Sequence, residues 1–287
     1  NIWAGERAGG ISGSEGIWGY TQGYVHDCAI YAEKYAGGVS GWMGVNSRSV
    51  YGLYIKNCYI GRKTDQYPHV KKDGENYSLE WVSDPGGVAS SYVGGLAGYS
   101  VGSNFCNDVV DDDVEINGWD FGGGFIGEGG GGTSYNLEGG ATVNMTNAYV
   151  GGYAGRLIGY TIESNVPVTK VSRSIIGGNV KGKEYVGCFA GGYQAGTRKV
   201  DPETGDPIPD DETGYMDHMA DIYYSRILLT LNVLNKTDPG SPNAGVITGD
   251  STRRTQDQIR YLRIYEGTDY NGTPLATTSL ITAKSGW

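Results

Sequence analysis

Short stretches of alternating apolar and polar residues recur along the chain and are separated by glycine-rich segments. Leu53-Tyr54-Ile55, Val114-Glu115-Ile116 and Val143-Asn144-Met145 are clear examples. Period-two alternation predicts strands that bury one face. Helical periodicity is weak through these repeats. Only the segment from Thr255 to Leu262 has a capping-box pattern, and we expect it to form a short helix.

A glycine-rich phrase accompanies each predicted strand region. Its clearest copy is Tyr92-Val93-Gly94-Gly95-Leu96-Ala97-Gly98, and looser copies begin at Ala8, Ala36, Gly122, Val150, Val186 and Ala244. The steps between the aligned glycines are 28, 57, 29, 28, 36 and 58 residues. A fixed period in this range is typical of repeat architectures. The sequence therefore predicts an all-β fold, a parallel β-solenoid with coils of about 28 residues.

Within the phrase, glycine allows a corner and a close approach of two backbones. One apolar residue of each copy is expected to point into the core. These residues are Ile11, Val39, Leu96, Phe125, Tyr153 and Phe189.

Two segments interrupt the repeats. Residues 62–91 and 198–220 combine proline, glycine and charged residues with few aliphatic residues, so both are expected to form exposed loops or lids. The predicted solenoid covers residues 1–250. Residues 251–287 depart from the repeat and are expected to form a cap or a link to a following module.

Composition restricts the class of partner. The chain has 287 residues, 50 glycines, 23 tyrosines and a formal net charge of −10. An acidic surface disfavours nucleic acid and anionic lipid as partners. No run of 18 apolar residues occurs, so membrane insertion of this chain is not expected.

The cysteines leave an alternative open. No Cys-x-x-Cys motif occurs, and Cys28 and Cys58 follow neighbouring copies of the phrase at similar distances. They are therefore expected at equivalent positions of adjacent coils, where a disulfide could form. Four buried free thiols are the favoured alternative.

The recurring phrase resembles the GLUG motif of bacterial surface proteins, including adhesins and regions that flank immunoglobulin A proteases. The resemblance covers about residues 8–249 and depends mainly on the copies at Tyr92–Gly98, Tyr149–Gly155 and Tyr185–Gly191. It implies a β-solenoid on a bacterial cell surface. It carries no catalytic residues, because the motif is structural.

Aromatic residues flank the phrase on both sides. Those that precede it are expected to stack into a ladder, which would either stabilise the coils or offer ring faces to sugars. The members of this ladder are Tyr35, Tyr92, Phe121, Tyr149 and Tyr185. Trp42, Tyr99 and Tyr193 follow the phrase and are the predicted ligand-binding residues of an exposed surface.

An acidic run provides a candidate calcium site. The candidate ligands are Asp111, Asp113, Glu115 and Asn117. From Asp113 onward the spacing follows part of an EF-hand loop, but the position of the required bidentate glutamate is occupied by Gly124. A strand with outward-facing acids is the alternative. No other cofactor is expected.

The residue types needed for catalysis are scattered. The chain has three widely separated histidines and lacks phosphate-loop, dinucleotide-binding and nucleophile-elbow motifs. We therefore expect a non-enzymatic extracellular surface protein. It would be adhesin-like or an accessory surface lipoprotein that binds a cell-surface glycan or protein, and it could belong to a larger surface assembly. A β-helix lyase or hydrolase acting on carbohydrate and a purely structural stalk or filament module are the alternatives.

Overall fold

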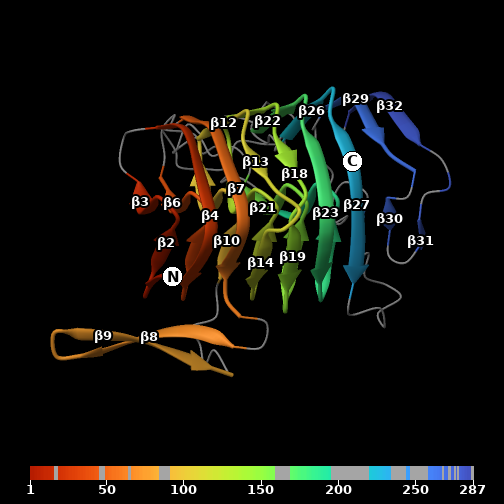
Figure 1. Cartoon of the computed structure of the whole chain (residues 1–287). Coiled ribbons are helices and arrows are strands. Elements are labelled where there is room, and N and C mark those ends of the chain that lie inside the picture. The colour runs from red at the N-terminus through yellow and green to blue at the C-terminus, as the bar shows by residue number, and fades with distance from the viewer. Residues whose placement is uncertain are drawn as a thin grey trace, which may run out of the picture.

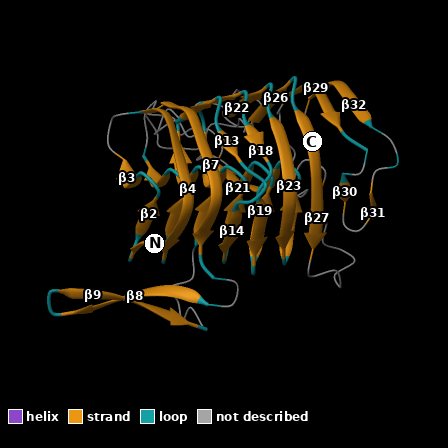
Figure 2. Cartoon of the chain, viewed as in Figure 1, coloured by secondary structure: helices purple, strands orange, loops and turns teal. Residues whose placement is uncertain are grey.

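A computed structural model describes the chain apart from several gaps. The described residues are 1–15, 19–44, 49–63, 66–83, 91–158, 169–194, 220–233, 244–245, 258–266, 268–270, 273–274, 276 and 278–285. Strands dominate these residues, and none of them is helical (Figure 2). The all-β prediction is therefore confirmed for this part of the chain.

Most strands join one 17-stranded sheet, called sheet A (Figure 1). Its strands are β1 (Ile2–Ala4), β4 (Tyr20–Ala32), β7 (Ser49–Gly61), β12 (Asn104–Cys106), β13 (Val109–Val110), β14 (Glu115–Gly118), β17 (Thr133–Tyr135), β18 (Glu138–Gly139), β19 (Thr142–Met145), β22 (Thr169–Ser172), β23 (Ile175–Gly182), β26 (Ala220–Tyr223), β27 (Arg226–Val233), β29 (Gln258–Ile264), β30 (Asp269–Tyr270), β31 (Thr273–Pro274) and β32 (Ser279–Ser285). Pairing is parallel except where β32 meets β29 and β31 meets β30.

The glycine phrases supply the strands of two smaller, fully parallel sheets. Sheet B consists of β2 (Arg7–Gly9), β5 (Tyr35–Gly37), β10 (Tyr92–Gly94), β15 (Phe121–Gly123), β20 (Ala148–Gly151), β24 (Glu184–Gly187) and β28 (Ala244–Gly245). Sheet C consists of β3 (Ser12–Glu15), β6 (Ser40–Met43), β11 (Ala97–Val101), β16 (Ile126–Gly130), β21 (Ala154–Ile158) and β25 (Ala190–Gln194).

Neighbouring copies of the phrase pair in register. In sheet B, Val93 is the partner of both Ala36 and Gly122. The chain passes through sheets A, B and C in turn and then returns to sheet A beside its previous passage. The parallel pairing between copies that the sequence predicts is thus present.

The three glycines of the Tyr92–Gly98 copy lie against backbone atoms that leave no room for a side chain. A Cβ atom at Gly94 would overlap the carbonyl oxygen of Ala97, and one at Gly95 would overlap the carbonyl oxygen of Gly124 in the next copy. A Cβ atom at Gly98 would lie 2.6 Å from the carbonyl oxygen of Tyr92. Because these neighbours are backbone atoms, they cannot rotate away as a side chain can. The phrase therefore allows sheets B and C to approach each other backbone to backbone.

The core is a set of apolar columns that run perpendicular to the strands. One column has no exposed surface and contains Ile30, Ile60, Ile116, Val143 and Val180, each the strand partner of the next. Burying a side chain of this size contributes about 1.5–3 kcal/mol. Each passage of the chain through sheet A therefore depends on its neighbours for its core.

The inward residues of the phrase are largely as expected. Val39, Leu96, Phe125, Tyr153 and Phe189 are all buried. The prediction for Ile11 is wrong, because this side chain is 46% exposed. Ile11 belongs to the first copy, which has a paired neighbour on one side only.

The first insertion is more ordered than the predicted loop or lid. Residues 66–83 form an antiparallel hairpin of β8 (Tyr67–Asp73) and β9 (Asn76–Val82), which projects from the end of β7 (Figure 1). Its base is held by the backbone N–H of Val70, which donates to Glu33 Oε1 over 2.5 Å, and by Trp81, whose ring lies 4.7 Å from that of Tyr31. The second insertion, residues 198–220, lies outside the described residues apart from Ala220.

The C-terminal segment contains strands where the sequence predicts a helix. Gln258–Ile264 forms β29, which pairs with β26 and β27. Leu262 and Ile264 are both buried, as period-two spacing on a strand requires. Hydrogen bonding to neighbouring strands of sheet A therefore outweighs the local preference of this segment for a helix. The assignment of residues 251–287 as a cap stays a prediction.

Candidate functional site

A column of left-handed residues turns the backbone at one corner of sheet A. It contains Gln22, Gly52, Asn107, Asn136, Arg173 and Tyr224, whose φ angles lie between 45° and 67°. Glycine and asparagine adopt this conformation at low cost. Hydrogen bonding continues across the corner. The N–H groups of Asn107 and Asn136 donate to the carbonyl oxygens of Tyr135 and Ser172 on neighbouring strands over 2.9 and 3.0 Å. We call this set the corner column.

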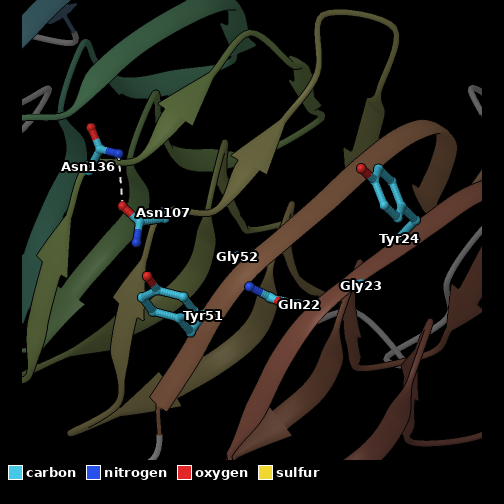
Figure 3. Close-up of a pocket in the computed structure, with 7 residues that line it drawn as sticks. All are labelled: Gln22, Gly23, Tyr24, Tyr51, Gly52, Asn107 and Asn136. Atoms are coloured by element: carbon cyan, nitrogen blue, oxygen red, sulfur yellow. Dashed lines mark hydrogen bonds between the residues drawn. The ribbon is translucent and has the colours of Figure 1, made fainter.

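A groove follows the first four members of this column. Its volume is about 710 Å³, and its lining residues are Gln22, Gly23, Tyr24, Tyr51, Gly52, Asn107 and Asn136 (Figure 3). Tyr24 and Tyr51 are 76% and 44% exposed, so both rings offer surface to a ligand. We call this feature the corner groove.

Amide groups form a short ladder in the groove. Asn136 Nδ2 donates to Asn107 Oδ1 over 2.8 Å, as the dashed line in Figure 3 shows. Each amide can make further hydrogen bonds, because a side-chain amide carries two N–H donors and an oxygen with two lone pairs. The groove thus presents fixed amides beside exposed rings.

A buried carboxyl group lies next to the groove in the chain. Asp108 is fully buried, and its Oδ1 accepts the backbone N–H of Leu53 over 2.8 Å. Burial raises the pKa of this carboxyl group to about 7, although backbone hydrogen bonds oppose the shift. Ser174 and Ser225 occupy equivalent places in later coils and accept backbone N–H groups in the same way. Asp108 therefore holds the corner together beneath the groove.

Tyr24 is supported from the next strand. The Tyr24 ring lies 5.7 Å from that of Tyr54, whose hydroxyl donates to Asp111 Oδ2 over 2.6 Å. This hydrogen bond lowers the pKa of Asp111 and raises that of Tyr54 to about 12. Lys56 Nζ also lies 3.7 Å from Asp111 Oδ2. Asp111 therefore positions a tyrosine.

The other predicted calcium ligands have separate partners. Asp113 Oδ1 accepts the backbone N–H of Asn57 over 2.6 Å, and buried Asn117 accepts the side-chain amide of Asn144 over 3.1 Å. Glu115 lies on β14 between its strand partners. Within the described part of the chain, no group of three or more His, Cys, Asp or Glu side chains is placed to hold a metal ion.

Two of the three predicted ligand-binding aromatics come together, and the third does not join them. Trp42 and Tyr99 are strand partners and are half-buried, with parallel rings 6.1 Å apart. Glu128 and Arg156 continue this column and form an ion pair, and Gly192 follows them. Tyr193 is one residue out of this register, so it faces inward and is only 4% exposed. It is not part of an exposed surface.

The predicted aromatic ladder is present. Consecutive rings from Tyr35 to Tyr185 stack with centroids 4.8–5.3 Å apart and with interplanar angles of 20° or less. Inside the ladder both faces of each ring are covered by neighbouring rings. A sugar needs a free face to stack, so this geometry favours the stabilising role.

Free thiols occur at all four cysteines. Cys28 and Cys58 are direct strand partners, as the spacing predicts. The thiols are free as in the favoured alternative, but only Cys58 and Cys188 are buried, whereas Cys28 and Cys106 are half-buried.

Sequence reasoning missed the corner groove. The sequence gives only a weak indication of this groove. Gly52, Asn107 and Asn136 all tolerate the left-handed conformation, but they share no sequence motif. Only the strand register brings these positions into one column.

Comparisons with protein-family models, with curated proteins and with solved structures find no match for this chain. In the described residues, no helix has the length and apolar character needed to cross a bilayer.

Proposed function

We propose that this chain is a β-solenoid that serves as a non-enzymatic, extracellular glycan-binding module of an adhesin-like surface protein. Parallel in-register pairing of successive phrase copies supports the solenoid, as does the resemblance of the phrase to the GLUG motif. A bacterial cell surface is the proposed location. We also propose that the chain can bind a protein partner and belong to a larger surface assembly.

The corner groove is the observation that carries the proposal. Sugar rings have apolar faces that stack on aromatic side chains, and their hydroxyl groups exchange hydrogen bonds with amides. Tyr24 and Tyr51 supply exposed rings, and Asn107 and Asn136 supply amides already held by a mutual hydrogen bond. Groups that are ordered before binding lose less conformational entropy when a ligand arrives.

The carboxyl groups near the groove support a binding role. Asp108 accepts a backbone N–H group in the interior, and Asp111 holds the Tyr54 hydroxyl. Asp108 and Asp111 each have a structural partner, whereas glycoside hydrolysis uses a pair of carboxyl groups that flank the substrate.

A glycan array probed with the wild-type chain tests the proposal. For the glycans that bind, Tyr51→Ala should weaken affinity roughly 2- to 10-fold, because one ring–sugar contact is lost. Tyr59→Ala is the matched control, since Tyr59 is 49% exposed on the same strand but does not line the groove. Absence of any bound glycan, or equal losses in both variants, would contradict the proposal.

A further inference from the structure

We propose that the glycan is acidic, and that Arg173 binds a sugar carboxylate at one end of the corner groove. The inference depends on the proposed function, since it specifies the ligand of the same groove.

Arg173 is the next member of the corner column after Asn136. Tyr135 and Ser172 are strand partners, so the residues that follow them, Asn136 and Arg173, occupy neighbouring positions. Adjacent strands lie about 4.8 Å apart. The side chain of Arg173 is exposed and therefore begins one strand spacing from the amide of Asn136 that lines the groove.

The Arg173 side chain leans back over the coil that contributes Asn136. Its Nη1 donates to the Tyr135 hydroxyl over 3.0 Å, and its guanidinium carbon lies 5.6 Å from the centre of the Tyr135 ring. Tyr135 directly precedes Asn136 in the chain. The cation is thus held beside the groove.

The guanidinium group retains capacity for a ligand. Across the described residues, no carboxylate lies within ion-pair distance of Arg173. Arginine carries five N–H donors in a planar arrangement that matches a carboxylate, and the contact with Tyr135 uses one nitrogen. The exposed cation attracts an anionic group locally, although the chain as a whole carries a net charge of −10.

Other charged residues near the groove should also change the affinity for an acidic ligand, and their charges predict the direction of the change. Glu138 is exposed and lies two residues after Asn136, so it opposes an anionic ligand. Asp111 is compensated by Lys56 at 3.7 Å. Removing the charge of Glu138 should therefore strengthen acidic ligands, whereas removing that of Arg173 should weaken them.

The experiment compares ligands that differ only in the carboxylate. Binding of a uronic-acid oligosaccharide and its methyl ester, and of a sialylated oligosaccharide and its methyl ester, is measured by calorimetry. The wild-type chain should prefer at least one free acid by about tenfold or more, since hydrogen bonds to charged groups are strong. The pair that shows the preference distinguishes uronate from sialate.

Three variants test whether Arg173 causes the preference for the free acid. Arg173→Gln should abolish the preference for the free acid, and Gln22 shows that glutamine fits this backbone conformation. Glu138→Gln should increase the preference about 2- to 3-fold at low salt. Lys72→Gln, which makes the same charge change on the distant hairpin, should have no effect.

Equal wild-type affinity for acid and neutral forms would overturn the inference. The glycan-binding proposal would survive that result if Tyr51→Ala still weakened both forms. A preference that persists in Arg173→Gln with an unchanged unfolding transition would also overturn the inference. If no form bound and the glycan array were empty, both proposals would fail.

Discussion

Replacing Asp108 by asparagine tests whether this buried carboxyl group makes stability depend on pH. Its pKa rises from 3.8 to about 7 on folding, so the folded state binds the proton more tightly than the unfolded state. The stabilising contribution of the protonated group is complete below pH 3.8 and is lost as the pH rises to about 7. Between about pH 5 and about pH 8, linkage gives a loss of roughly 2.5 kcal/mol.

Asp108→Asn should remove this loss. The amide oxygen can still accept the backbone N–H of Leu53, while the new N–H₂ donors carry a cost of about 1–3 kcal/mol that does not vary with pH. The informative quantity is therefore the difference in unfolding free energy between variant and wild type, measured by urea denaturation at both pH values. This difference should shift in favour of the variant by about 2.5 kcal/mol from low to high pH.

A second variant separates charge from packing. Asp108→Ser reproduces the residue that the chain itself uses at Ser174 and Ser225 in the same column, and it should flatten the pH dependence to the same extent. If both variants follow the wild-type pH profile, Asp108 is not the group that titrates on unfolding, and the reasoning from its burial is refuted.

Two further predictions concern the stacking of the coils. Gly98→Ala should lower the free energy of unfolding by about 1–3 kcal/mol, because its Cβ would meet backbone atoms of Tyr92 and Gly41 at 2.6 and 2.7 Å. Gly5→Ala, whose Cβ would meet only Val70 at 3.7 Å, should change it by less than about 0.5 kcal/mol in the same denaturation assay, and equal effects would contradict this explanation. Glutathione disulfide should oxidise Cys28 and Cys58 to a disulfide and is itself reduced to two glutathione thiols. The two cysteines are strand partners, so their Cα atoms lie about 4.8 Å apart, which is within disulfide range. Peptide mapping by mass spectrometry checks this, and a link that involves Cys106 or Cys188 instead would show that the register is wrong.

Sequence period alone determined which parts of the chain pair. Every copy of the glycine phrase carries glycine at the position of Gly94, where a Cβ atom would meet backbone of the same copy and of the next. This shared glycine lets neighbouring copies pair with one another. The same period placed Cys28 beside Cys58 and stacked the aromatic ladder. These features repeat, so each depends only on the spacing along the chain.

Tertiary structure decided what does not repeat. One extra residue before Tyr193 moves its ring from the column of Tyr99 into the core, because side chains alternate between the faces of a strand. The corner groove exists only where Tyr51, Asn107 and Asn136 come into register from separate coils. The spacing of residues within one segment does not say which other strand will pair with it. The corner groove depends on that pairing, so only the tertiary structure reveals it.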